Sequence, residues 1–134
     1  MIMKKILLFL ILTLVLTACG DDCYNKPQTI AFEFVNTDNE NLLANGELTT
    51  FSIRDENQSS IQLTKTSDNK VILEGVGEYD GTKNYTFYSN IKVFDFSIQS
   101  SEFTAGCNGY QINKLTFHGV EVTDQQGYYR IVLE

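Results

Sequence analysis

Apolar and polar side chains alternate along most of residues 29–134 of this chain. Phe32 and Phe34 are separated by a single residue, as are Phe94, Phe96 and Ile98 further along. Successive side chains of an extended strand point to opposite faces, so this spacing is typical of strands with one buried face. No stretch after residue 18 shows a convincing repeat of 3.6 residues. The pattern therefore predicts an all-β domain.

Turn sequences divide the alternating segments at short intervals. Asn45-Gly46, Ser67–Lys70, Asp80-Gly81 and Asp124–Gly127 are the clearest, because Gly and Asn tolerate positive φ. The segments between turns predict strands over residues 30–35, 48–55, 61–65, 71–79, 85–89, 91–99, 112–122 and 128–133. Within two of these segments, Gly75, Gly77 and Gly119 suggest a bulge or a bend. An antiparallel β-sandwich of about 7–8 strands, immunoglobulin-like or transthyretin-like, buries one face of each sheet against the other. A small closed β-barrel uses the same alternation and remains the alternative.

The N-terminus has the features of a secretory signal. Lys4 and Lys5 are followed by an apolar run over residues 6–16, which only Thr13 interrupts, and then by small residues. This run is about half the roughly 20 residues that a helix needs to cross a bilayer. It therefore predicts a cleaved leader and no permanent membrane span.

Leu16-Thr17-Ala18-Cys19 closes this leader and resembles the lipobox of bacterial lipoproteins. In that family the cysteine receives a diacylglycerol, and the chain is cut directly before it. The resemblance implies a lipoprotein signal peptide over 1–18, lipidation of Cys19, an acidic and polar tether over 19–28 and a folded domain over 29–134. Two or three acyl chains give stable anchoring in a membrane.

The residues after Cys19 bear on the choice of membrane. Enteric lipoproteins that stay in the inner membrane carry Asp directly after the lipidated cysteine, whereas this chain has Gly20. The outer membrane is therefore expected, on its periplasmic face or at the cell surface. Cys19-Gly20-Asp21-Asp22 also resembles the start of Bacteroidetes lipoproteins, in which acidic residues favour surface display; a solvated acidic tether explains them equally well.

The net charge limits the choice of partners. The chain carries −7 at pH 7, and loss of the leader with Lys4 and Lys5 makes it −9. Binding of nucleic acid needs a basic surface, so nucleic acid is not expected as a partner. Acidity of this kind generally keeps an exported domain soluble.

Two cysteines remain once Cys19 is assigned to lipid. Cys23 and Cys107 lie in a chain expected to enter an oxidising compartment, which predicts one disulfide. It would close a loop of about 85 residues, worth on the order of 3–5 kcal/mol in the chain-entropy model. Two unpaired thiols are the alternative. No metal site is expected, because two cysteines and one histidine fall short of a zinc ligand set.

A second, more diffuse resemblance spans most of the mature chain. Ile30–Val35 is followed by a polar turn and then by Glu40–Gly46, and the chain ends in Tyr129–Leu133. These segments are similar to small Flavobacteria-type lipoproteins of unknown function. The resemblance implies a β-sandwich and no activity.

Catalytic motifs are sparse. His118 is the only histidine and is expected to be a surface or structural residue, because no Gly-x-Ser-x-Gly elbow or other triad pattern accompanies it. No phosphate-binding or dinucleotide motif is present, so no cofactor is expected. Tyr79, Tyr85 and Tyr88 cluster around the Asp80-Gly81 turn and form a weak candidate for a binding surface, since exposed tyrosines often contact ligands.

These observations lead to three hypotheses of different class. The first is a non-enzymatic, membrane-tethered module that binds a protein or a glycan or serves the cell envelope. The second is an inhibitor of a hydrolase, in the periplasm or at the surface. An enzyme comes third, and a deep pocket that holds His118 beside a carboxylate and a hydroxyl would favour it.

Overall fold

The computed structural model describes residues 23–134, and within this range all regular secondary structure is β-strand. Its ten strands are β1 (Tyr24–Asn25), β2 (Ile30–Val35), β3 (Phe51–Asp55), β4 (Leu63–Lys65), β5 (Val71–Leu73), β6 (Gly81–Ser89), β7 (Phe94–Phe103), β8 (Asn108–His118), β9 (Glu121–Asp124) and β10 (Tyr129–Val132). The predicted all-β class is confirmed.

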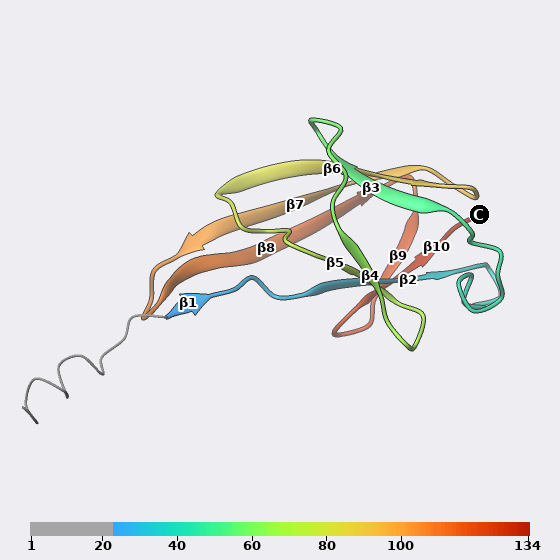
Figure 1. The fold of residues 1–134 in the computed structure, drawn as a ribbon, viewed down its shortest axis with the longest axis horizontal. Coiled ribbons are helices and arrows are strands. Elements are labelled where there is room, and N and C mark those ends of the chain that lie inside the picture. The colour runs from blue at the N-terminus through green and yellow to red at the C-terminus, as the bar shows by residue number, and fades with distance from the viewer. Residues whose placement is uncertain (1–22) are drawn as a thin grey trace, which may run out of the picture.

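The strands form two sheets that face each other (Figure 1). Sheet A has the strand order β1-β8-β7-β6-β3, and sheet B has the order β4-β5-β2-β10-β9. In sheet A the long strands β6, β7 and β8 lie side by side, and β1 adds to the outer edge of β8 at one end of the molecule (Figure 1). The chain is thus a β-sandwich of two five-stranded sheets.

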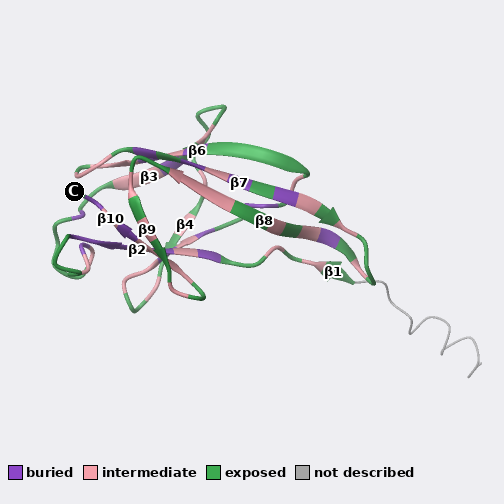
Figure 2. Cartoon of the chain, turned by 180° about the vertical axis from the view of Figure 1, so that it is seen from behind, coloured by how far each residue is buried: buried purple, intermediate pink, exposed green. Residues whose placement is uncertain are grey.

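The core lies between the two inner faces and is rich in aromatic rings. Buried and exposed residues alternate along β7, as Figure 2 shows. Phe94, Phe96 and Ile98 point inward, and each is at most 4 % exposed. From sheet B, the buried Phe32 meets Phe96 edge to face, with ring centroids 5.4 Å apart. The alternation in the sequence therefore identified the residues that join the two layers.

Two strand pairs are parallel, so the sandwich is not wholly antiparallel as the sequence analysis expected. β2 pairs with β10 in parallel, and Phe32 lies opposite Tyr129. β1 pairs with β8 in parallel, and Tyr24 lies opposite Asn108. Residues 24 and 25 fall in the segment predicted as a tether, so part of that segment belongs to sheet A. Short-range patterns contain no information on which distant strands pair.

Glycines with positive φ divide two segments that were predicted as single strands. The strand expected over 71–79 ends at Leu73, and Gly75 and Gly77 follow with φ of 67° and 88°. The strand expected over 112–122 is broken at Gly119, where φ is 70°. There the chain leaves sheet A at His118 and enters sheet B at Glu121. Glycine adopts these backbone angles without steric cost, which allows the change of sheet.

Candidate functional site

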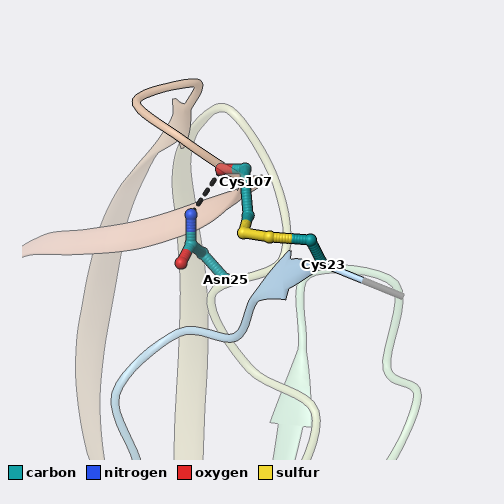
Figure 3. Close-up of a disulfide and its surroundings, with 3 residues drawn as sticks. All are labelled: Cys23, Asn25 and Cys107. Atoms are coloured by element: carbon teal, nitrogen blue, oxygen red, sulfur yellow. Dashed lines mark hydrogen bonds between the residues drawn. A yellow bond between two sulfur atoms is a disulfide. The ribbon is translucent and has the colours of Figure 1, made fainter. Parts of the chain in front are cut away.

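Cys19, the predicted lipid attachment point, lies outside the described residues, but the structure joins the other two cysteines. Cys23 and Cys107 form a disulfide with their Cα atoms 5.2 Å apart (Figure 3). The side-chain amide of Asn25 donates a hydrogen bond to the carbonyl oxygen of Cys107. These contacts fasten the first described residues to the loop between β7 and β8. The predicted disulfide is confirmed.

Gly109 allows β1 to lie this close to β8. It is buried and pairs with Asn25 across the parallel ladder. A Cβ at this position would collide with the backbone carbonyl oxygen of Asn25. The requirement for glycine at residue 109 is thus steric, because two backbones approach each other directly.

The three candidate tyrosines do not share one exposed surface. Tyr85 is 5 % exposed, and its ring stacks on Phe96 with centroids 5.3 Å apart. Tyr79 is half-buried, and its hydroxyl donates to the carbonyl oxygen of Ile98 over 2.9 Å. Burial raises the pKa of both phenols. Tyr79 and Tyr85 therefore stabilise the interior of the sandwich.

Tyr88 lies on the other face of β6, since side chains alternate along a strand and Tyr85 points inward. The guanidinium of Arg54 lies over its ring, 5.2 Å from the centroid. Tyr88 is half-buried beneath this contact. Only this member of the predicted cluster belongs to the outer face of sheet A.

A row of polar residues crosses the outer face of sheet A. Arg54, Thr86, Asp95 and His118 occupy successive register positions on β3, β6, β7 and β8. The hydroxyl of Thr86 donates to Asp95 Oδ1 over 2.7 Å. Asp95 and His118 are exposed, as the sequence analysis expected for His118. The sheet thus brings a cation, a hydroxyl, a carboxylate and an imidazole from distant segments into one line.

The turn that follows β3 forms a wall beside this row. Asp55 Oδ1 accepts hydrogen bonds from the backbone N–H groups of Asn57 and Ser59, which stabilises the turn. Glu56 Oε1 accepts from the backbone N–H of Asn84 over 2.7 Å and from its side-chain amide over 2.9 Å. The pairing of β3 with β6 ends at Asp55 and Tyr85, so no residue of β3 lies opposite Asn84. The Glu56 carboxylate accepts the hydrogen bond from the Asn84 N–H that a backbone carbonyl of a longer β3 would otherwise accept.

Between the turn and the row lies an open cleft of about 370 Å³. Its lining offers carboxylates, amides, a hydroxyl and an imidazole, and the residues that form it are Asp55, Glu56, Gln58, Asn84, Tyr85, Thr86, Asp95 and His118. The walls therefore offer both hydrogen-bond donors and acceptors to a polar ligand. We refer to these eight residues as the outer-face cleft.

The cleft contains the types of side chain that a hydrolase uses, but their hydrogen bonds do not form a catalytic relay. A triad needs a hydroxyl that donates to a histidine, which a carboxylate orients. Here the Thr86 hydroxyl donates to Asp95, and no hydrogen bond joins His118 to either residue among those described. The cleft is also open, with His118 and Asp95 exposed to solvent.

Sequence reasoning did not identify Glu56, Asn84 or Asp95 as members of a site. Each is an ordinary polar residue in its own segment. Because side chains alternate along a strand, Asp95 points to the opposite face of the sheet from the core residues Phe94 and Phe96. Its exposure could therefore be expected. Its position between Thr86 and His118 depends on strand register, which the sequence does not specify.

Among residues 23–134, no group of three or more His, Cys, Asp or Glu side chains is arranged to hold a metal ion. The described part of the chain also contains no helix with the length and apolar character needed to cross a membrane.

Comparison with known proteins assigns no family to the fold or the cleft. No protein-family model matches the chain, and no curated protein or solved structure matches it significantly.

Proposed function

We propose that this chain is an exported lipoprotein, anchored through lipid on Cys19 at the outer membrane, whose β-sandwich is a non-enzymatic binding module. The disulfide between Cys23 and Cys107 is the observation that carries the proposal. Structural disulfides form in oxidising compartments and are rare in the cytosol. The bond therefore supports an exported protein, in agreement with the basic and apolar leader that precedes Leu16–Cys19.

The outer-face cleft supports binding as the activity. An open site with carboxylate, amide and hydroxyl groups suits a polyhydroxylated ligand, whose hydroxyls donate to Asp95 and Glu56 and accept from amides and the imidazole. A glycan is therefore the preferred ligand class.

The anchor is tested by changing Cys19 to Ala. The unchanged protein should sediment with membranes and carry acyl chains on its first residue by mass spectrometry. The Cys19→Ala variant should lack acylation and should not remain in the outer-membrane fraction as the mature protein. A mature protein that is soluble and unacylated in the wild type would contradict the anchoring.

Binding is tested with an array of envelope and host glycans. Asp95→Asn and Glu56→Gln should each weaken binding about tenfold or more, because each charged acceptor contributes roughly 1.5–3 kcal/mol to a hydrogen bond. Asp38→Asn and Glu121→Gln are matched controls, since both acids are exposed and lie outside the cleft. Equal loss in the controls would show that net charge, and not the cleft, governs binding.

A hydrolase inhibitor remains the second candidate, and one observation favours it. The loop over residues 104–107 joins β7 to β8, and the disulfide holds it to β1. Rigid loops of this kind lower the entropic cost of inserting into an enzyme. This loop nevertheless lies at the end of the domain from which the tether leaves, where the membrane would obstruct a large partner. We therefore prefer a ligand at the outer-face cleft.

A further inference from the structure

We propose that the end of the sandwich that carries the Cys23–Cys107 disulfide rests on the membrane surface, so that the domain stands with its long axis pointing away from the bilayer. This proposal rests on the proposed anchoring at Cys19. It adds a defined contact surface and a defined orientation to that anchoring.

Only a short segment separates the proposed lipid attachment point from the disulfide. Cys19 and Cys23 are four residues apart, so their Cα atoms are separated by at most about 14 Å in any conformation. Cys23 is bonded to Cys107, with 5.2 Å between their Cα atoms. The loop between β7 and β8 is therefore held close to the lipid, although it lies more than 80 residues further along the chain.

The domain is elongated, and the disulfide lies at one end of its long axis (Figure 1). β1 and the adjoining ends of β7 and β8 form one end of the long axis, and the C-terminus lies toward the other end (Figure 1). β7 runs for ten residues from Phe94 to Phe103, or about 30 Å at roughly 3.3 Å per residue. A short link at one tip of an elongated body brings that tip to the membrane and leaves the opposite tip far from it.

The disulfide end of the domain exposes an aromatic side chain. Tyr24 is 47 % exposed and follows the disulfide directly; Val93, near the opposite end of β7, is the other exposed large apolar residue in the described chain. Tyrosine is favoured at the level of lipid headgroups, where the ring lies in a partly apolar layer and the hydroxyl stays in water. Tyr24 is thus suited to the membrane interface.

Charge at the same tip limits the depth of the contact. Glu102 is exposed on β7 next to the loop, and Lys26 is exposed just after β1. Burial of either charge in hydrocarbon would be costly, so the tip contacts headgroups and does not insert. The disulfide is needed for this geometry, because β1 and β8 share only two residue pairs.

The orientation also places the outer-face cleft. β8 begins beside the disulfide at Asn108 and ends in the cleft at His118, about 30 Å away at roughly 3.3 Å per residue. The cleft is thereby raised from the bilayer and accessible to a large ligand.

The chain contains no tryptophan, which allows a single-probe experiment. Ala105→Trp places the probe in the exposed loop at the disulfide end, and Val93→Trp places it at an exposed position near the other end of β7. Each acylated protein is purified from membranes and inserted into vesicles of phosphatidylethanolamine and phosphatidylglycerol whose acyl chains are brominated close to the headgroup. Bromine quenches tryptophan fluorescence only at short range.

The Ala105→Trp protein should lose roughly half or more of its fluorescence at the interface, whereas the Val93→Trp protein should keep its emission. Replacing both Cys23 and Cys107 by Ser in the Ala105→Trp protein should reduce the quenching at equal acylation. Equal quenching of both probes would indicate a domain lying flat and would overturn the proposal. No quenching at Ala105→Trp, or quenching that persists without the disulfide, would also overturn it.

Failure of the anchoring itself is recognised separately. Mass spectrometry of the mature N-terminus and flotation with vesicles report acylation without regard to orientation. An unacylated protein that does not float would refute the proposed function and this inference together. An acylated protein that floats but shows the wrong quenching pattern would refute the orientation alone.

Discussion

Arg130 donates a hydrogen bond from Nε to Glu33 Oε1 over 2.8 Å, and this ion pair joins the parallel strands β2 and β10. The residues are 97 positions apart in the sequence. Both side chains are partly buried, with exposed fractions of 33 % for Arg130 and 14 % for Glu33. The pair thus fixes the last strand of the chain beside the first long one.

Replacing Glu33 by Gln should lower the free energy of unfolding by about 1 kcal/mol or more, because the charged acceptor of a partly buried hydrogen bond is lost. Asp68→Asn is the control, since Asp68 pairs with Lys70 while 62 % of its side chain is exposed. Exposed pairs contribute roughly 0–1 kcal/mol, so the control should change stability less. Urea denaturation measures both. A larger effect at Asp68 would contradict the assigned role of the Glu33–Arg130 pair.

Replacing Phe96 by Ala should lower the free energy of unfolding by about 3–5 kcal/mol, the usual cost of emptying an aromatic site in a core. The Phe96 side chain is 1 % exposed, and its ring contacts rings from both sheets, including Phe32 and Tyr85. Val93→Ala on the neighbouring turn should change stability little, because Val93 is 55 % exposed. Denaturation of the two variants side by side gives the comparison, and similar losses would rule out a sandwich core at Phe96.

Stability should fall as the pH rises above about 10, the ordinary pKa of tyrosine. Burial raises the pKa of Tyr79 and Tyr85 in the folded protein, so above this pH the unfolded chain loses these protons first. Below it, both states keep the phenols neutral and the full stability is present. The free energy of unfolding, measured from pH 8 to pH 11, should show this decline.

Tyr79→Phe should be less stable than the wild type at pH 8 by about 1–2 kcal/mol, because the hydrogen bond to the carbonyl of Ile98 is lost. The variant lacks one of the titrating phenols, so its stability should decline less steeply above pH 10. The difference between the two proteins should therefore shrink with pH. Parallel curves would indicate that Tyr79 ionises equally in both states.

Reduction of the disulfide should lower the free energy of unfolding by up to about 4–5 kcal/mol, the chain-entropy value for a loop of this length. The Cys23→Ser and Cys107→Ser double variant should behave like the reduced protein. Hydrogen exchange should also show loss of protection at Asn108 and Gly109, which pair with β1. Unchanged stability after reduction would mean that the unfolded chain is not constrained by this bond.

Several features of the fold could be predicted because they depend on short stretches of chain. Phe94, Phe96 and Ile98 repeat every second residue, and burial on one face of β7 follows directly from that spacing. The same local pattern could not show that Gly119 moves the chain from one sheet to the other. Tyr85 alternates with Phe87 on one face of β6, so its burial agrees with this spacing and contradicts only its assignment to an exposed cluster of tyrosines.

The outer-face cleft could not be predicted from the sequence, for a related reason. Thr86, Asp95 and His118 become neighbours only through the register of three strands. A shift of one residue in either pairing would turn one of these side chains toward the core. Register is determined by packing between the sheets, which involves residues from the whole domain.

The sequence by itself determined the all-β class and the inward-facing residues of the main strands, because these follow from side-chain periodicity. It predicted the disulfide between Cys23 and Cys107, which the structure confirms. Tertiary structure alone decided that β2 and β10 run parallel, that Tyr24 and Asn25 become part of the edge of sheet A, and that a cleft forms beside Glu56. Each of these depends on contacts between segments far apart in the chain. Such contacts form only when the apolar faces of the two sheets are buried together. The free energy gained by this burial depends on several segments at once, so no single segment predicts it.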